Sequence, residues 1–387
     1  MKYYNLLFEK NAKNKKINKK LLIINKCLTF QIKHGYLNAI TLNRMLLFVN
    51  KISKLKQIPV LFDLKNVILT DKLSYILFET ICYELIKNGH TVFVNLDCKT
   101  DIRTIGIINS PLLLLNDRGN IRYNQNKYCD KFESEIYNNH YCRLITEKRK
   151  SNKSYLSVIY TEIFSFLTNF NISKKNRDLF AQVAVELIGN ACEHTDSECY
   201  VDIDVTNEHY KVGQDLSYDS SDNKYHGINI AILNFSNVLL GEELKNKIKN
   251  GSIQSTRYQK LLDAYDFHNK HFNSKYTEED FFNIAVFQNK ISGRMDTEYV
   301  GGTGLTYLIN YLQQKSDNDN CYVLSGNRIV YFVKEYLQYD DDWIGFNKNN
   351  DFFKAIPESE VLTTCNMFFP GTAYNLNFVM QSEDNNE

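Results

Sequence analysis

The chain has 387 residues, a length typical of roughly two to three domains. Its hydrophobic fraction of 43% excludes a largely disordered chain, and its formal net charge of +1 argues against a protein whose main role is to bind a polyanion. The nine cysteines are odd in number and include no Cys-x-x-Cys pair. We therefore expect reduced thiols in a cytoplasmic protein, with neither a disulfide framework nor a zinc site.

Residues 1–55 form an N-terminal segment that is rich in lysine and partly helical. Six lysines lie between Lys10 and Lys20 without an aromatic platform or groove-reading motif, so we expect solvated chain there rather than a nucleic-acid site. The apolar run at 21–24 is too short to span a membrane, and the start of the chain is not a secretory signal, so we expect no membrane attachment. Apolar residues at helical spacing predict a helix over 41–55.

A strand, a helix and a second strand are predicted next, within residues 57–96. An apolar extended run covers 58–64, with a short second run at 67–69, and Asp71 is a candidate N-cap for the helix that follows. Gly89 stands where a helix C-terminal glycine belongs, before a second buried strand at 91–96. This order predicts a βαβ unit with a parallel strand pair.

The sequence of this unit, Pro-Val-Leu-Phe-Asp-Leu-Lys-Asn-Val-Ile-Leu-Thr-Asp, then the helix and Gly-His-Thr-Val-Phe-Val-Asn, resembles a STAS domain, the fold of anti-sigma-factor antagonists. The resemblance implies an interaction module over residues 56–150 that binds a protein partner. In that family a phosphorylatable Ser or Thr commonly follows the helix-opening Asp, but here Lys72 does, so phosphorylation is not carried over. For the nearby Thr70 and Ser74 we expect turn and capping roles.

The third segment, residues 155–380, opens with a helix to about residue 167. A second helix is predicted over 179–195, where an apolar stripe runs beside a polar ridge with a spacing of four residues. The ridge consists of Gln182, Glu186, Asn190 and His194. A carboxylate, a carboxamide and an imidazole therefore lie along one edge of a helix whose neighbouring face is buried.

The remaining elements alternate strands with helices. Residues 199–205 alternate apolar and polar side chains and predict a half-exposed strand, while 228–235 predict a buried one. An aromatic helical insertion follows at 241–290, and a helix follows the glycines at 301–304. Strands are predicted at 322–324, 329–333 and 374–380, and an acidic tail at 381–387.

Three motifs of this segment resemble the GHKL ATPase domain shared by gyrase-type, chaperone, mismatch-repair and histidine-kinase ATPases. Glu186-Leu-Ile-Gly-Asn190-Ala-Cys-Glu-His194 resembles its N-box, most closely that of serine kinases acting as anti-sigma factors. Gly301-Gly-Thr-Gly-Leu305 resembles the G2 box, and Gly371-Thr372 the segment that closes the adenine pocket. The resemblance implies an α/β sandwich in which helices cover one face of a mixed sheet, with ATP and Mg²⁺ as ligands.

The residue types of these motifs suit that chemistry. Asn190 offers Mg²⁺ an amide oxygen without adding negative charge beside the phosphates, and Glu186, one turn earlier, can orient or deprotonate the attacking water or hydroxyl. For His194, a phosphate or lid contact and a structural hydrogen bond both stay open. The backbone N–H groups of the glycine cluster are expected to cradle the phosphates, together with a hydroxyl and the start of the helix. This cluster is Gly301, Gly302, Thr303, Gly304 and Leu305.

One motif departs from the family. Where GHKL proteins place an Asp and a Gly-x-Gly turn after the strand, this chain has Asn234 and no glycine before Gly241. An Asn carbonyl oxygen can still accept from the adenine amino group, so we expect Asn234 and Thr372 to contact the base. The missing glycines predict a differently shaped turn and put adenine selectivity and catalytic rate in doubt.

Two further features of the insertion have alternative interpretations. His268 and His271 are three residues apart on a predicted helix and could form a metal pair, although with no third ligand we expect an ordinary solvated helix face. Arg294, just before the glycine cluster, either reaches a phosphate or pairs with Asp296 or Glu298.

Three functions are therefore open for the chain. We expect an ATP-binding, Mg²⁺-dependent ATPase that acts as a nucleotide-driven regulatory switch for a protein partner. The alternatives are a serine/threonine protein kinase of the anti-sigma type and a non-catalytic nucleotide sensor. A homodimer stays open as well.

Overall fold

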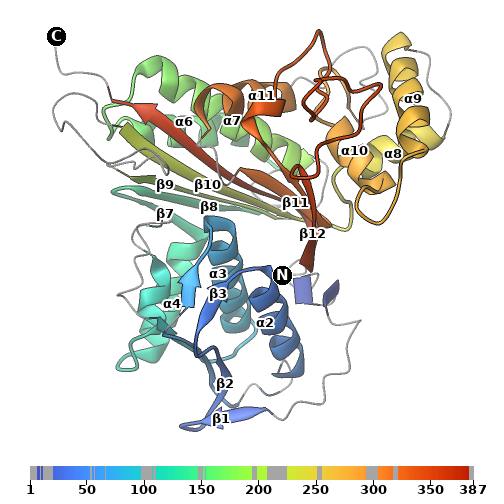
Figure 1. The fold of residues 1–387 in the computed structure, drawn as a ribbon. Helices are drawn as coiled ribbons and strands as arrows, with labels where there is room; N and C mark the ends of the chain where they lie inside the picture. The colour runs from blue at the N-terminus through green and yellow to red at the C-terminus, as the bar shows by residue number, and fades with distance from the viewer. Residues whose placement is uncertain are drawn as a thin grey trace, which may run out of the picture.

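The computed structural model is a mixed α/β fold of two stacked units (Figure 1). It describes residues 7–8, 10–11, 21–52, 55, 57–65, 67–96, 107, 110–146, 151–152, 154–193, 198–206, 225–250, 255–292, 304–316 and 321–382. Within these residues no helix combines the length and the apolar character needed to cross a membrane. All eight cysteines in this part of the chain are buried thiols.

The N-terminal unit is built on a four-stranded sheet in which three strands are parallel. The strand order is β1 (Leu22–Ile24), β2 (Cys27–Gln31), β4 (Val60–Leu64) and β6 (Val92–Leu96). A parallel pair, β3 (Gly35–Leu37) and β5 (Val67–Leu69), lies beside it. The helices of this unit are α2 (Ala39–Ile52), α3 (Lys72–Lys87), the short 3₁₀ helix η2 (Pro111–Leu115) and α4 (Ile121–Glu133).

The predicted βαβ unit is confirmed, because β4 and β6 are parallel and α3 connects them. The Asp71 side chain caps α3 by accepting from the Ser74 backbone N–H at 2.6 Å. After the helix, Gly89 adopts a φ of 87°, the left-handed conformation that a C-terminal glycine provides. The Ser74 hydroxyl donates to the Asp71 carboxylate, and the Thr70 hydroxyl donates to the Leu37 carbonyl, as expected for capping and turn roles.

The C-terminal unit is a six-stranded sheet. The strand order is β11 (Tyr322–Tyr331), β12 (Leu362–Gln381), β10 (Tyr225–Phe235), β9 (Cys199–Thr206), β8 (His140–Ile145) and β7 (Ser134–Tyr137). Every pairing among these strands is antiparallel, so the expectation of a mixed sheet was wrong. The reason is visible between β8 and β9. Helices α6 (Tyr155–Leu167) and α7 (Lys174–Glu193) pack against each other and return the chain to the edge it left, where Ile145 pairs with Cys199.

The sheet is covered on both faces rather than one. Helices α6, α7 and α11 (Gly304–Lys315) lie on one face, and the N-terminal unit lies on the other (Figure 1). Alternate residues of β10 show this clearly, because Ile230 and Ile232 belong to the helical core whereas Ala231 and Leu233 face the N-terminal unit. Because the N-terminal unit covers the second face, seven of the eight residues of β9 are buried, whereas the sequence predicts a half-exposed strand.

The predicted domain boundaries need two corrections. The sequence predicts that residues 134–145 belong to the first domain, but they form β7 and β8 and extend the C-terminal sheet. The sequence predicts a separate segment at residues 1–55, but the strands and α2 within residues 21–52 complete the N-terminal unit. Both errors arise because strand partners distant in sequence decide where a segment belongs.

The insertion at 241–290 contains α8 (Glu242–Lys249), α9 (Thr256–Asn269) and α10 (Glu278–Ala285). After it, two predicted strands are a single strand, β11, with a bulge near Gly326, whose φ is 59°. The last strand, β12, is much longer than predicted and pairs with both β10 and β11.

Candidate functional site

Helix α7 presents the two residues expected to carry the chemistry. Its apolar stripe is buried as predicted, from Phe180 through Val183 and Leu187. On the ridge beside it, Glu186 is exposed and Asn190 is partly buried. The helix therefore uses one face for the core and leaves the Glu186–Asn190 edge accessible to a ligand.

Asn234 and Thr372 are brought together across the sheet. They are direct partners in the register of β10 and β12, and Asn234 is only 5% exposed. Both have the same strand parity as Ile232 and Tyr374, which belong to the helical core, so they face the layer that contains α7. We call this pair, with its neighbours Cys199 on β9 and Ser325 on β11, the Asn234 row.

Gly371 is the residue that makes the Asn234 row so compact. Its φ is 105°, and a Cβ at this position would lie 2.0 Å from the backbone carbonyl oxygen of Asn234. Ser325 supports the same turn, since its hydroxyl donates to the Gly371 carbonyl at 2.7 Å and accepts from the Leu240 N–H at 2.9 Å. Any side chain at position 371 would displace the strand beside Asn234.

The C-terminal end of α7 lies near the same strand ends as the Asn234 row. The helix ends at Glu193 and β9 begins at Cys199, which pairs with Asn234. Six peptide units span at most about 20 Å, so the end of the helix cannot be far from the row. Among the ridge residues that the structure describes, Asn190, one turn before the end of α7, is therefore the nearest to the row along the chain.

Helix α11 lies beside α7 on the same face of the sheet (Figure 1). Its C-terminal end is next to Phe378, with which Ser316 forms an isolated bridge. Its first turn is consequently directed away from Phe378, and there the Thr306 hydroxyl donates to the Asn289 side chain at 3.1 Å. The predicted glycine loop leads into this first turn, because Gly304 is the first residue of α11.

Several predicted site residues lie outside the part of the chain that the structure describes: His194, Arg294, Asp296, Glu298, Gly301, Gly302 and Thr303. Leu305, which follows them, is partly buried and packs against the helical core. The described residues thus bring together Asn234 and Thr372, place Glu186 and Asn190 on one helix edge, and leave the phosphate loop as a prediction.

The histidine pair in the insertion does not form a metal site. His268 is fully buried, so the expectation of a solvated face was wrong for this residue. Its Nε2 lies 2.8 Å from the Phe352 carbonyl oxygen and its Nδ1 lies 2.7 Å from the Tyr276 hydroxyl. Burial also lowers the pKa of His268. Because both ring nitrogens are engaged, His268 anchors the insertion rather than binding an ion.

Asn283 on α10 is a candidate that the sequence analysis missed. It is 1% exposed, and neither its amide nitrogen nor its carbonyl oxygen has a hydrogen-bond partner among the described residues. The backbone of the preceding residue, Phe282, lies against Gly241 in the turn after Asn234, where a Cβ would approach to 2.6 Å. The visible signal was a polar residue inside the apolar run Phe-Phe-Asn-Ile-Ala.

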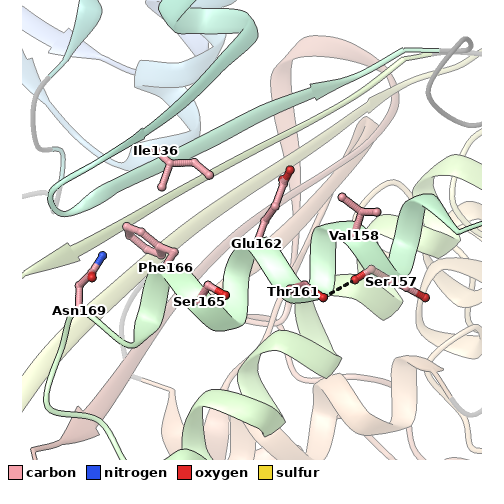
Figure 2. Close-up of a pocket in the computed structure, with 8 residues that line it drawn as sticks. All are labelled: Ile136, Ser157, Val158, Thr161, Glu162, Ser165, Phe166 and Asn169. Carbon is pink, nitrogen blue, oxygen red and sulfur yellow. Dashed lines mark hydrogen bonds between the residues drawn. The ribbon is translucent and has the colours of Figure 1, made fainter.

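Two cavities of the described structure lie away from the residues predicted to bind nucleotide. A groove of about 600 Å³ separates the edge strand β7 from α6 and exposes Ile136 and Val158 (Figure 2). A polar cavity of about 860 Å³ is lined by the Asp340–Asp342 run together with Arg257 and Trp343. Neither contains any of the residues predicted to bind nucleotide.

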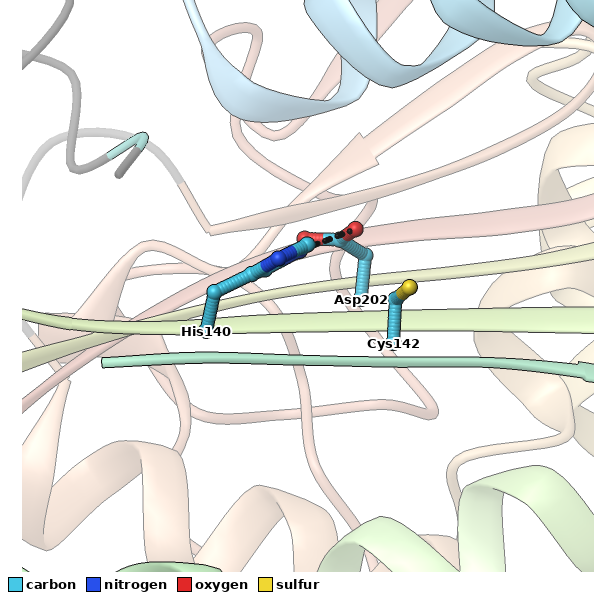
Figure 3. A group of neighbouring side chains, drawn as sticks. All are labelled: His140, Cys142 and Asp202. Carbon is cyan, nitrogen blue, oxygen red and sulfur yellow. Dashed lines mark hydrogen bonds and ion pairs between the residues drawn. The ribbon is translucent and has the colours of Figure 1, made fainter. Parts of the chain in front are cut away.

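A buried ionic cluster joins the two units and was also missed. His140, Cys142 and Asp202 lie close enough together to suggest a metal site (Figure 3). However, the Lys72 ammonium lies 2.5 Å from Asp202 Oδ1 and also contacts Asp204. It already supplies the positive charge that a metal ion would bring, so we do not assign a metal here.

The protonation of this cluster follows from burial and pairing. Burial lowers the pKa of Lys72, but Asp202 and Asp204 outweigh it and raise that pKa to about 12. Burial likewise opposes ionisation of His140, yet Asp202 and Glu135 hold its pKa well above the usual value. Burial would raise the pKa of Asp202, but Lys72 and His140 keep it below the usual range. Lys72 and His140 are therefore cations facing buried carboxylates.

Comparison with protein-family models, with curated proteins and with solved structures found no match to this chain.

Proposed function

We propose that the chain binds ATP with Mg²⁺ and hydrolyses it, and that it acts as a nucleotide-driven switch for a protein partner. The N-terminal unit is proposed to be STAS-like and the C-terminal unit GHKL-like. The observation that carries the proposal is the Asn234 row. Asn234 and Thr372 face the helical layer as a pair, at the edge of the sheet where α7 ends.

Each group then has a defined role. Asn234 accepts from the base amino group, with the Thr372 hydroxyl beside it. Asn190 ligates Mg²⁺ through its amide oxygen, and Glu186 orients the attacking water. The glycine loop before α11 holds the phosphates at the start of that helix.

Incubation of the purified protein with γ-labelled ATP and Mg²⁺ tests this function. Release of free phosphate without labelled protein supports the ATPase. Label transferred to a co-purified partner supports the protein kinase instead. Nucleotide binding with neither product leaves the non-catalytic sensor, and absence of binding contradicts all three.

A further inference from the structure

The first turn of α3 rests on the back of the six-stranded sheet, on the face opposite α7 and α11. One cross-strand row of the sheet passes beneath it, formed by residues that the strand registers place opposite one another. This row is Tyr322, Asn375, Ala231, Asp202, Cys142 and Glu135. At its centre Ala231 presents only a methyl group, which lets the helix approach closely.

Three consecutive residues, the N-cap and the first two residues of α3, make polar contacts with three different strands. The Leu73 backbone N–H donates to Asn375 Oδ1 on β12 at 3.0 Å. Lys72 pairs with Asp202 and Asp204 on β9. Asp71, the helix cap, faces the Tyr322 hydroxyl on β11.

These contacts fix one docking position of the N-terminal unit. Lys72, Asp202 and Asp204 are each at most 2% exposed, so moving one of them away from its partner leaves a buried charge less well compensated, which is costly. Any sliding of α3 along the sheet would take the Lys72 ammonium away from Asp204 and leave Asp202 with His140 as its one remaining cation among the described residues. The contacts of Asp71, Lys72 and Leu73 can therefore form together only when β9, β11 and β12 are in register.

The same strands carry the Asn234 row on the opposite face. Ala231 and Asn234 are three residues apart on β10, and Asp202 and Cys199 are three residues apart on β9, which corresponds to about 10 Å along each strand. A ligand that orders these strand ends on the face covered by α7 consequently also orders the strands that α3 contacts on the opposite face.

We propose that this contact transmits nucleotide binding to the N-terminal unit, so that a nucleoside triphosphate bound at the Asn234 row stabilises the docked position of α3. We call it the α3 clamp, defined as Asp71, Lys72 and Leu73 against Tyr322, Asn375, Asp202 and Asp204. The inference rests on the proposed function and describes how nucleotide binding would act on the N-terminal unit. The two states are a closed clamp and an open one in which the first turn of α3 loosens, and the ligand favours the closed state.

Hydrogen exchange with mass spectrometry tests this coupling on the full chain, with and without a non-hydrolysable ATP analogue and Mg²⁺. In the wild type the analogue should slow exchange in the first turn of α3 by about fivefold or more, the lower end of typical allosteric coupling. The triple variant Lys72→Met, Asp202→Asn, Asp204→Asn removes the ionic contact of Lys72, and His140 keeps Glu135 as its charged partner. It should keep slowed exchange in α7 and lose it in α3.

Lys87→Met is the matched control, because Lys87 is on the same helix and forms an exposed pair with Glu133. It should behave like the wild type. The inference is overturned if the analogue binds the wild type without slowing α3, and this measurement stands even if the triple variant does not fold. Equal slowing of α3 in the triple variant overturns it as well. If calorimetry shows no binding to the wild type, the proposed function fails first and this inference with it.

Discussion

Replacing Glu79 by glutamine should remove a pH-dependent loss of stability that originates between the two units. Glu79 is 1% exposed on α3, and Ser110 donates to its carboxyl at 3.3 Å. Burial raises the pKa of Glu79 to about 8; nearby Asp202 adds to this, whereas His140, Tyr75 and Lys72 oppose it. The folded protein therefore carries a neutral Glu79 at pH 7.

The sign and size of the effect follow from linkage. Above pH 4.5 the unfolded chain ionises Glu79, whereas the folded chain keeps the proton up to a pKa of about 8. In this interval the unfolded state binds fewer protons, so the free energy of unfolding falls by about 1.4 kcal/mol per pH unit, or roughly 5 kcal/mol over the whole interval. The stabilisation is full below pH 4.5 and lost by pH 8.

Urea denaturation of the wild type and Glu79→Gln between pH 5 and pH 8.5 measures this difference. The variant should match the wild type near pH 5 and exceed its stability by several kcal/mol near pH 8. Glu133→Gln is the control: burial opposes its ionisation, but Lys87 and Tyr83 lower the pKa of Glu133, so this variant should be less stable than the wild type by a nearly constant amount between pH 5 and pH 8.5. Parallel curves for the wild type and Glu79→Gln would refute a neutral buried Glu79.

Two core substitutions, each with a comparison variant, test the packing around the site. Gly371→Ala should destabilise the protein by at least about 3 kcal/mol, because strain at a φ of 105° is joined by a clash with the Asn234 carbonyl. Gly89→Ala, at a φ of 87° with nothing within 4 Å, should cost clearly less in the same urea titration, and equal costs would contradict the clash. Asn283→Leu should raise the free energy of unfolding by about 1 kcal/mol, because it removes a buried unpartnered amide. The comparison variant Asn375→Leu should lower the free energy of unfolding, since Asn375 accepts a hydrogen bond from the Leu73 N–H. A large loss of stability in Asn283→Leu would instead show that Asn283 is hydrogen-bonded.

Local features of the fold were readable from the sequence because each depends on neighbouring residues. The Asp71 cap, the Gly89 terminus and the buried stripe of α7 follow from spacing and side-chain type alone. The order of strands and helices that led to the predicted site follows in the same way. Asn234 and Thr372, predicted separately, are register partners in the structure.

Features that depend on distant partners were not readable. Lys72 stood out in the sequence only as a residue that cannot accept phosphate, whereas its partner Asp204 is 132 positions away. The alternation in β9 predicts a half-exposed strand, because nothing local indicates that the N-terminal unit covers Asp202 and Asp204. The sequence likewise predicts a solvated position for His268, whereas both of its ring nitrogens lie against buried partners, the Phe352 carbonyl oxygen and the Tyr276 hydroxyl.

Calorimetric titration with Mg²⁺ and ATP tests the central claim most directly, on the wild type, Asn190→Ala and Glu186→Ala. Both ridge residues lie on the accessible edge of α7, so neither substitution disturbs the core. The wild type and Glu186→Ala should bind Mg²⁺-ATP, with Glu186→Ala losing turnover, while Asn190→Ala should lose Mg²⁺-dependent binding. Wild-type affinity in Asn190→Ala, or no binding by the wild type, would contradict the assignment of this site.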